Sequence, residues 1–119
     1  MKKTTILTKV LTYEGLENEH MTTHYKDTPT IVYQNGVDGL FVGRSFKDKT
    51  DNGYAQNGRW IIYHHSGLTL PATFPSRKKA IEIMHRLSDL ADWTQDTNTL
   101  GCDRALFDKT NRVCRGREA

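Results

Sequence analysis

Residues 60–93 read WIIYHHSGLTLPATFPSRKKAIEIMHRLSDLADW, and this stretch decides the fold class. It opens with an apolar strand over 59–65, and a Ser-Gly turn follows at 66–67. Residues 68–74 then alternate apolar and polar side chains, which is typical of a half-buried strand. Pro71 cannot donate a hydrogen bond to a neighbouring strand, so this second strand is predicted to lie at a sheet edge.

The same stretch ends in an amphipathic helix. Ser76 is a suitable N-cap, because its hydroxyl can accept a hydrogen bond from a backbone N–H of the first turn. Apolar side chains follow at helical spacing on one stripe, namely Ala80, Ile83, Met84, Leu87, Leu90 and Ala91. The pattern predicts one long helix that frays near Trp93.

A hairpin precedes this stretch. Residues 30–33 are strand-forming, and the Asn-Gly pair at 35–36 readily adopts the positive φ angles of a tight turn. The return strand is predicted over 40–46. A long polar loop is predicted over 47–58, just before the apolar strand.

The N-terminal region is less regular. The apolar residues over 6–13 fit a helical stripe, whereas the threonines over 4–12 favour a strand, and we predict a strand. Residues 14–28 show no clean period and are predicted to form a polar loop. Together these elements predict an α+β fold, with a four- or five-stranded antiparallel sheet of hairpins and one long helix packed on one face.

Length and composition indicate a single folded domain. The 119 residues are 36% hydrophobic and 26% charged, which suits one modest core rather than a disordered chain. We predict one domain over 1–108 and a mobile basic tail over 109–119. No apolar run approaches the roughly 18 residues of a membrane span, and the segment after Lys3 lacks the core of a signal peptide. A cytoplasmic location with reduced cysteines is therefore expected.

The sequence lacks the motifs of common catalytic and cofactor sites. There is no Gly-x-Ser-x-Gly elbow, phosphate-binding loop or dinucleotide fingerprint, so neither enzyme activity nor a cofactor is predicted. Cys102 and Cys114 are separated by 11 residues. Paired metal ligands stand about two to four residues apart, so no metal site is predicted either.

His64 and His65 form the sharpest cluster of reactive side chains. Neighbouring strand residues point to opposite faces, so the two rings are not expected to serve one metal or one substrate. We interpret such a strand-end histidine as holding the turn by a hydrogen bond. A small hydrolase that uses either ring is the third functional hypothesis. A metal pair at His20 and His24 would need a helical segment, which residues 21–23 disfavour.

Charged groups supply the candidate binding surface. The formal net charge is +3, which permits nucleic-acid binding without arguing strongly for it. Cations at a helix N-terminus oppose the helix dipole, so a basic group there indicates contact with a partner. A plain solvated surface is the alternative interpretation. The predicted partner-binding residues are Lys47, Lys49, Arg59, Arg77, Lys78, Lys79, Asp89 and Asp92.

Part of the chain resembles small proteins of phages and plasmids. In those proteins a Trp-led strand, a glycine hairpin and a Phe-(Thr/Ser)-Arg entry lead into an Ala-rich helix that ends in Asp-Trp. Residues 60–94 follow this layout, with Trp60, Gly67, the Phe-Pro-Ser-Arg run at 74–77 and the Asp-Trp pair at 92–93. The resemblance implies an inhibitor or modulator of a host machine, of the anti-CRISPR or other anti-defence type. It carries over no catalytic residue.

We therefore expect a non-catalytic binding protein of a mobile genetic element that docks on a host protein or ribonucleoprotein and modulates it. The loop over 47–58 with Arg59, and the exposed charges of the helix, are the expected contact surfaces. The alternative is a small nucleic-acid-binding regulatory protein. Its affinity would fall steeply with salt, because phosphate contacts release counterions.

Overall fold

The computed structural model describes residues 2–15, 21–47, 49–50, 53–96, 100 and 104–115. Its elements in chain order are β1 (Lys2–Gly15), β2 (Met21–Gln34), β3 (Leu40–Arg44), β4 (Lys49–Thr50), β5 (Gly53–Tyr54), β6 (Trp60–His64), β7 (Thr69–Phe74), α1 (Arg77–Leu87) and α3 (Arg104–Cys114).

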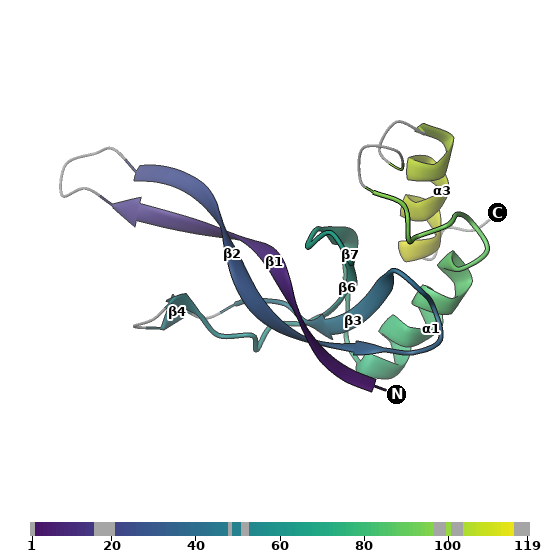
Figure 1. The fold of residues 1–119 in the computed structure, drawn as a ribbon, viewed down its shortest axis with the longest axis horizontal. Helices are drawn as coiled ribbons and strands as arrows, with labels where there is room; N and C mark the ends of the chain where they lie inside the picture. Colours follow the sequence, from purple (N-terminus) through teal and green to yellow (C-terminus); the bar gives the residue numbers. More distant parts are fainter. Residues whose placement is uncertain are drawn as a thin grey trace.

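The main sheet has five strands in the order β1-β2-β3-β6-β7, and each neighbouring pair is antiparallel. The two helices lie together at one end of the molecule, whereas the far ends of β1 and β2 extend away from them (Figure 1). This arrangement confirms the predicted α+β fold with an antiparallel sheet built from hairpins. β7 lies at a sheet edge, as the proline at its third position predicts.

β1 and β2 form a long two-stranded arm. Their pairing runs without a break over residues 2–15 and 21–34. The strand predicted over 6–13 is thus confirmed, but the loop predicted over 14–28 is wrong wherever the structure describes it. Threonines recur along both strands, and cross-strand pairs of β-branched residues stabilise a strand that shows no apolar alternation.

The predicted central hairpin is confirmed. β2 pairs with β3 where Tyr33 lies opposite Val42, and β3 pairs with β6 along its whole length. The long loop predicted over 47–58 is only partly a loop, because β4 and β5 pair there as a separate small hairpin.

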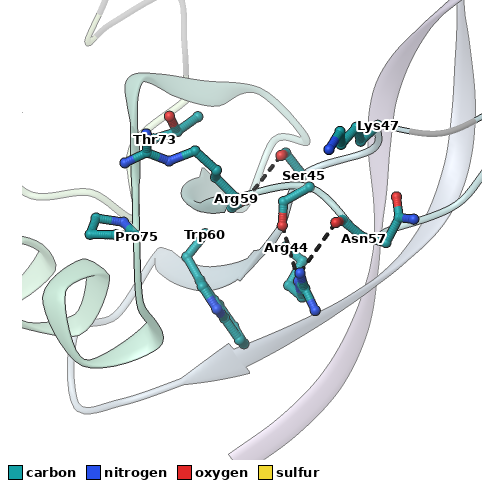
Figure 2. Close-up of a pocket in the computed structure, with 9 residues that line it drawn as sticks. Arg44, Ser45, Lys47, Asn57, Arg59, Trp60, Thr73 and Pro75 are labelled. Atoms are coloured by element: carbon teal, nitrogen blue, oxygen red, sulfur yellow. Dashed lines mark hydrogen bonds between the residues drawn. The ribbon is translucent and has the colours of Figure 1, made fainter.

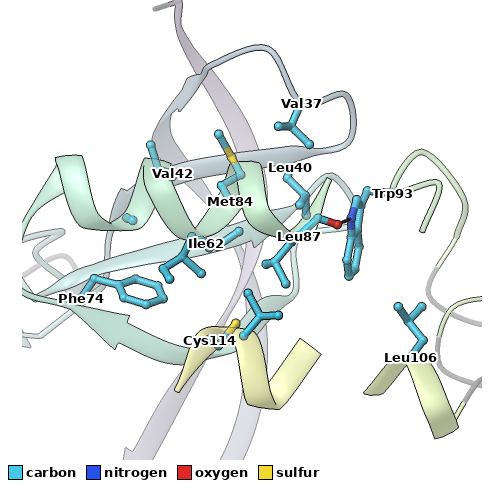
Figure 3. Close-up of a cluster of buried hydrophobic side chains, with 13 residues drawn as sticks. Val37, Leu40, Val42, Ile62, Phe74, Met84, Leu87, Trp93, Leu106 and Cys114 are labelled. Carbon is cyan, nitrogen blue, oxygen red and sulfur yellow. Dashed lines mark hydrogen bonds between the residues drawn. The ribbon is translucent and has the colours of Figure 1, made fainter. Parts of the chain in front are cut away.

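The main core lies between the sheet and the helices. α1 packs against β3, β6 and β7, and α3 packs against β7 and α1. Side chains from all of these elements meet in one buried cluster (Figure 3). Its members are Val37, Leu40, Val42, Ile62, Phe74, Ala80, Ile83, Met84, Leu87, Trp93, Leu106, Val113 and Cys114.

The opposite face of the sheet carries a smaller core. Val32, Ile61 and Tyr63 are buried there, with Ile6 of β1 and Phe41 of β3 packed against them. β1 therefore covers part of the face that the helices leave open.

The turn between β6 and β7 reaches back to β1. Lys9 donates its backbone N–H to the Gly67 carbonyl at 3.1 Å. Gly67 has a φ of 96°, and a Cβ at this position would lie 2.6 Å from the Leu7 carbonyl oxygen. Only glycine fits so close an approach, so a glycine in this turn lets it contact β1.

α1 is shorter than predicted. Ser76 does cap its first turn, since its hydroxyl accepts a hydrogen bond from the Lys79 N–H at 3.2 Å. The helix nevertheless ends at Leu87 rather than near Trp93. Beyond it the backbone tightens into a turn, in which the Leu90 N–H donates to the Leu87 carbonyl at 3.0 Å, and the Trp93 indole N–H donates to the same carbonyl at 2.8 Å. The prediction of one long helix is therefore wrong: α1 is short, and a further short helix, α3, follows it in the described part of the chain.

The second helix, α3, lies where a mobile tail is predicted. It runs over residues 104–114 and crosses the predicted domain boundary. Leu106 and Val113 pack into the main core, so residues 109–115 belong to the folded domain and the tail prediction is wrong for them. Residues 116–119 lie outside the described part of the chain.

Candidate functional site

Four basic side chains and two aromatic rings gather where α1 begins, and we call this set the basic–aromatic surface. Its members are Tyr33, Arg44, Lys47, Arg59, Trp60 and Arg77. They line two hollows of about 520 Å³ and 300 Å³, the larger of which is drawn in Figure 2. Arg44 and Trp60 line both hollows, which therefore adjoin.

The charge and exposure of these side chains suit contact with an anionic partner. All four cations are exposed, whereas both rings are half-buried at the margin of the main core. Among the described residues that line the two hollows, none is acidic. Like charges gathered beside apolar rings produce a local positive potential that attracts anionic groups.

A backbone ladder holds the larger hollow in shape. Beyond the end of β3, the Ser45 N–H donates to the Arg59 carbonyl at 2.9 Å, and the Gly58 N–H donates to the Ser45 carbonyl at 2.7 Å. A Cβ on Gly58 would lie 2.2 Å from the Ser45 Oγ, so a glycine is needed for this close pairing. Lys47 and Arg59 thus project from an extended hairpin rather than from an unsupported loop.

Arg44 is oriented by the backbone around it. Its Nε and Nη2 donate to the carbonyls of Gly58 and Asn57 at 3.0 and 3.2 Å (Figure 2). A guanidinium has about five N–H donors, so these two bonds fix its plane and leave donor capacity for a ligand.

The backbone of Arg44 is fixed from the opposite face of the sheet. The Tyr63 hydroxyl donates to the Arg44 carbonyl at 3.0 Å. Burial raises the pKa of Tyr63 to about 12, so the phenol remains protonated and keeps donating at physiological pH.

Arg77 lies against the aromatic pair. Its guanidinium carbon lies 5.8 Å from the centre of the Tyr33 ring and 6.0 Å from the centre of the Trp60 ring. The two ring centres are 6.1 Å apart. Cation–π contacts at exposed sites contribute about 0.5–1 kcal/mol each, which offsets the cost of a cation at a helix N-terminus. The same contacts hold Arg77 beside the smaller hollow.

Gln56 joins the arm to this surface. Its side-chain oxygen accepts a hydrogen bond from the Ile31 N–H at 2.9 Å, and its side-chain N–H donates to the Ile31 carbonyl. The amide therefore bonds to β2 as a neighbouring strand would, at a residue for which no pairing with β3 is observed.

The structure brings together some of the predicted basic residues and separates others. Lys47, Arg59 and Arg77 come from separate segments and converge on the basic–aromatic surface. Lys78 and Lys79 are exposed on the first turn of α1 but line neither hollow. The side chain of the remaining predicted cation, Lys49, lies outside the described residues.

The predicted acidic residues lie elsewhere. Asp89 and Asp92 follow the C-terminal end of α1, and the 11 residues of that helix span about 16 Å. Asp92 accepts hydrogen bonds from the Thr94 N–H, at 3.0 Å, and from the Thr94 hydroxyl, and these bonds lower the pKa of Asp92. Its observed contacts build a local turn. A role for either acid in partner binding stays a prediction.

Sequence reasoning missed three members of the surface, namely Tyr33, Arg44 and Trp60. Arg44 and Trp60 are register partners on adjacent strands, so they share one face of the sheet. The sequence did place Arg44 and Trp60 in two predicted strands, over 40–46 and 59–65, and this was the signal that could have found them. Only the strand register shows that they meet.

His64 has a structural role. Its Nε2 donates to the Trp93 carbonyl at 2.8 Å, so its Nδ1 is the acceptor that meets the Ser66 hydroxyl at 2.8 Å. The interpretation that this histidine holds the turn is confirmed. Burial lowers the pKa of His64, and the nearby His65 ring lowers it further. The neutral ring therefore persists in the folded protein.

The expectation that the two histidine rings point apart is wrong. Their centres are 4.2 Å apart, because β6 ends at His64 and His65 already belongs to the turn. The His65 ring lies 3.1 Å from the Gln95 carbonyl, so both rings face residues 93–95. The other predicted pair, His20 and His24, has side chains outside the described residues.

Cys114 is a free, buried thiol of the main core. Burial raises the pKa of this thiol to about 11, which keeps it protonated and unreactive. Cys102 lies outside the described residues. Within the described part of the chain, no group of three or more His, Cys, Asp or Glu residues could hold a metal ion.

Comparison with protein-family models, with curated proteins and with solved structures gave no match in any of the three cases. The resemblance of residues 60–94 to phage and plasmid proteins therefore stays a prediction. Among the helices that the structure describes, none is long and apolar enough to cross a membrane.

Proposed function

We propose that this chain is a non-catalytic binding protein that docks through its basic–aromatic surface on an acidic face of a host protein or ribonucleoprotein and modulates it. The observation that carries the proposal is the convergence of Arg44, Lys47, Arg59 and Arg77 around two aromatic rings.

The composition of this surface supports docking. Tryptophan, tyrosine and arginine are the residues that most often dominate the binding energy of protein interfaces. Trp60 and Tyr33 offer apolar area at its centre, and the exposed cations surround them. Arg44 and Arg77 are already held by carbonyls and rings, so binding costs less side-chain entropy than it would for unrestrained arginines.

The reactive side chains support a non-catalytic role. His64 has both ring nitrogens engaged within the fold, and the Cys114 thiol is held protonated in the core. The resemblance to phage and plasmid proteins would make the partner a host defence complex, and the cytoplasm would be the place of encounter.

A nucleic-acid-binding regulator is the second candidate, and the two rings favour it. A base that stacks on an exposed aromatic side chain contributes about 1–3 kcal/mol, while nearby cations contact phosphates. The half-buried rings of Trp60 and Tyr33 lie within reach of Arg44 and Arg77 in the smaller hollow.

Binding titrations would distinguish the two candidates. Fluorescent poly-glutamate represents an acidic protein face, and labelled single- and double-stranded oligonucleotides represent nucleic acid. Each is titrated at about 50 and 200 mM salt, where phosphate-driven affinity changes most. Preference for the peptide supports protein docking, and micromolar oligonucleotide binding that collapses with salt supports the second candidate. Absence of binding to every probe at the lower salt would contradict both.

A paired charge reversal tests the site itself. Lys47→Glu with Arg59→Glu removes two cations from the larger hollow, and we expect the affinity for the preferred probe to fall at least tenfold. The matched control is Lys78→Glu with Lys79→Glu, which makes the same change in net charge outside both hollows. Equal losses in the two variants would show that net charge, and not this surface, governs binding.

A further inference from the structure

A separate apolar cavity of about 280 Å³ lies between β7 and α3, and we call it the β7–α3 pocket. Leu68, Leu70 and Pro71 line it from the strand side. Leu106 and Phe107 line it from the helix. Phe107 is 60% exposed and Leu68 is 47% exposed, so apolar side chains also form part of its rim.

One buried polar atom in this pocket has no partner among the residues that the structure describes. The Thr110 side chain is only 5% exposed, and its Oγ1 makes no hydrogen bond with any of them. A helical threonine commonly bonds back to a carbonyl one turn earlier, but this hydroxyl does not. Leaving such a group unsatisfied is costly, so an orphaned hydroxyl on a cavity wall points to a partner that the chain itself does not supply.

The other buried polar side chain of the pocket is already satisfied. His64 lines the cavity, but its two ring nitrogens are bonded to Ser66 and to the Trp93 carbonyl. Thr110 is therefore the buried side chain with unused hydrogen-bonding capacity among the described residues of the wall.

We infer that the β7–α3 pocket binds a small, largely apolar molecule that carries one hydroxyl or carbonyl group, and that this group bonds to the Thr110 hydroxyl. A hydroxyl both donates and accepts, so either ligand group meets it. One water molecule takes up roughly 30 Å³ of the liquid, so the volume of about 280 Å³ is several waters in size and accommodates a ligand of the size of a substituted phenol. This site is separate from the basic–aromatic surface and does not depend on its proposed role.

Two isosteric probes test the inference. p-Cresol has the required hydroxyl, and p-xylene has a methyl group in its place. Each is titrated to millimolar concentration into the full chain, and amide shifts in ¹H–¹⁵N spectra report where it binds. We expect saturable shifts for p-cresol at residues of β7 and α3, with residues of the basic–aromatic surface unaffected. Absence of saturable shifts there with p-cresol would overturn the proposal.

Thr110→Val keeps the shape of the side chain and removes the hydroxyl. We expect this variant to bind p-cresol about fivefold more weakly, which is the loss of one ordinary hydrogen bond. Its affinity for p-xylene should be unchanged or higher, and its Tm should not fall, because an unsatisfied polar group has been removed. Equal effects on the two probes, or none on p-cresol, would contradict a hydrogen bond to Thr110.

A second copy of the chain is the competing occupant. Self-association that rises with protein concentration and is abolished by Phe107→Ser would show that the rim is a dimer contact, and would overturn the ligand site. We expect sedimentation to give the same species for the wild type and for Phe107→Ser.

Discussion

The helix-bearing face of the sheet has a different structure at each end of α1. At the N-terminal end of α1, Trp60 is half-buried beside four exposed cations, and two hollows remain open. Beyond the C-terminal end of α1, Trp93 is buried and its indole N–H bonds to the Leu87 carbonyl. We call these the open end and the closed end.

The comparison teaches that the same residue type serves two purposes in one fold. At the closed end a tryptophan is buried and bonds to a carbonyl at the end of a helix. At the open end a tryptophan leaves ring surface exposed beside charge. We therefore assign the larger share of stability to the closed end and binding of the anionic partner to the open end, and four predictions test this division.

The largest effect is expected at Gly39, whose backbone lies close to that of Trp93 at the closed end. Gly39 has a φ of 89°, and a Cβ there would lie 2.2 Å from the Trp93 carbonyl oxygen. Gly39→Ala combines backbone strain with a steric clash, so we expect the free energy of unfolding to fall by about 3 kcal/mol or more. Urea unfolding measures it.

Gly36→Ala is the matched control for this prediction. Its φ is 73°, but the nearest atom to a new Cβ is His85 Cε1 at 3.6 Å, an ordinary contact. This variant should lose only about 1 kcal/mol, from backbone strain alone. A loss as large as that of Gly39→Ala would show that strain, and not the approach of Trp93, sets the cost.

The next effect separates the two tryptophans. Trp93→Phe removes a buried hydrogen bond to the Leu87 carbonyl, which keeps the Leu90 N–H as a donor, and it also replaces a buried indole by a smaller ring. It should cost about 2 kcal/mol of unfolding free energy. Trp60→Phe keeps most of the ring surface and should cost less than about 1 kcal/mol. Denaturant titration of both variants checks this order. The reverse order would mean that the open end stabilises the fold.

A third prediction concerns pH and the closed end. The pKa of His64 is lowered in the folded protein, so the unfolded chain binds more protons just below the ordinary histidine pKa of about 6.5. Stability should therefore fall as pH drops from about 7.5 to about 5.5. Urea unfolding at both pH values should show that His64→Gln flattens this dependence. An unchanged slope in His64→Gln would contradict the assignment.

The smallest effect on stability is expected at the open end. Lys47→Glu with Arg59→Glu changes exposed side chains, so the free energy of unfolding should change by less than about 0.5 kcal/mol. Thermal unfolding followed by circular dichroism checks this. A large loss would mean that the binding defect expected of this variant arises from unfolding.

The sequence predicted correctly those elements whose boundaries are set by residues close together in the chain. The Asn-Gly turn, the edge strand with Pro71 and the Ser76 cap all follow from residues within a few positions of one another. The C-terminal end of α1 was missed because apolar residues continue at helical spacing to Leu90 and Ala91, whereas the backbone tightens into a turn after Leu87, where the Leu90 N–H and the Trp93 indole N–H both donate to the Leu87 carbonyl. α3 was missed because Thr110 is polar yet lies buried in the middle of its apolar stripe.

The binding surface was predictable only in part. The basic residues are visible in the sequence, but their convergence requires the strand register and the direction of α1. Arg44 and Trp60 meet across β3 and β6, and Arg77 reaches the rings from a third segment. The threonine-rich arm was missed for a similar reason, since its pairing partners are up to 32 positions apart.

The central claim, that the open end and not the closed end contacts the anionic partner, is tested most directly by the two indole N–H signals. The chain has two tryptophans, so ¹H–¹⁵N spectra report Trp60 at one end and Trp93 at the other. The preferred anionic probe, poly-glutamate or oligonucleotide, is titrated into the labelled protein. We predict a saturable shift of the Trp60 indole signal with the Trp93 signal unmoved. A shift confined to Trp93, or binding that moves neither signal, would contradict the account.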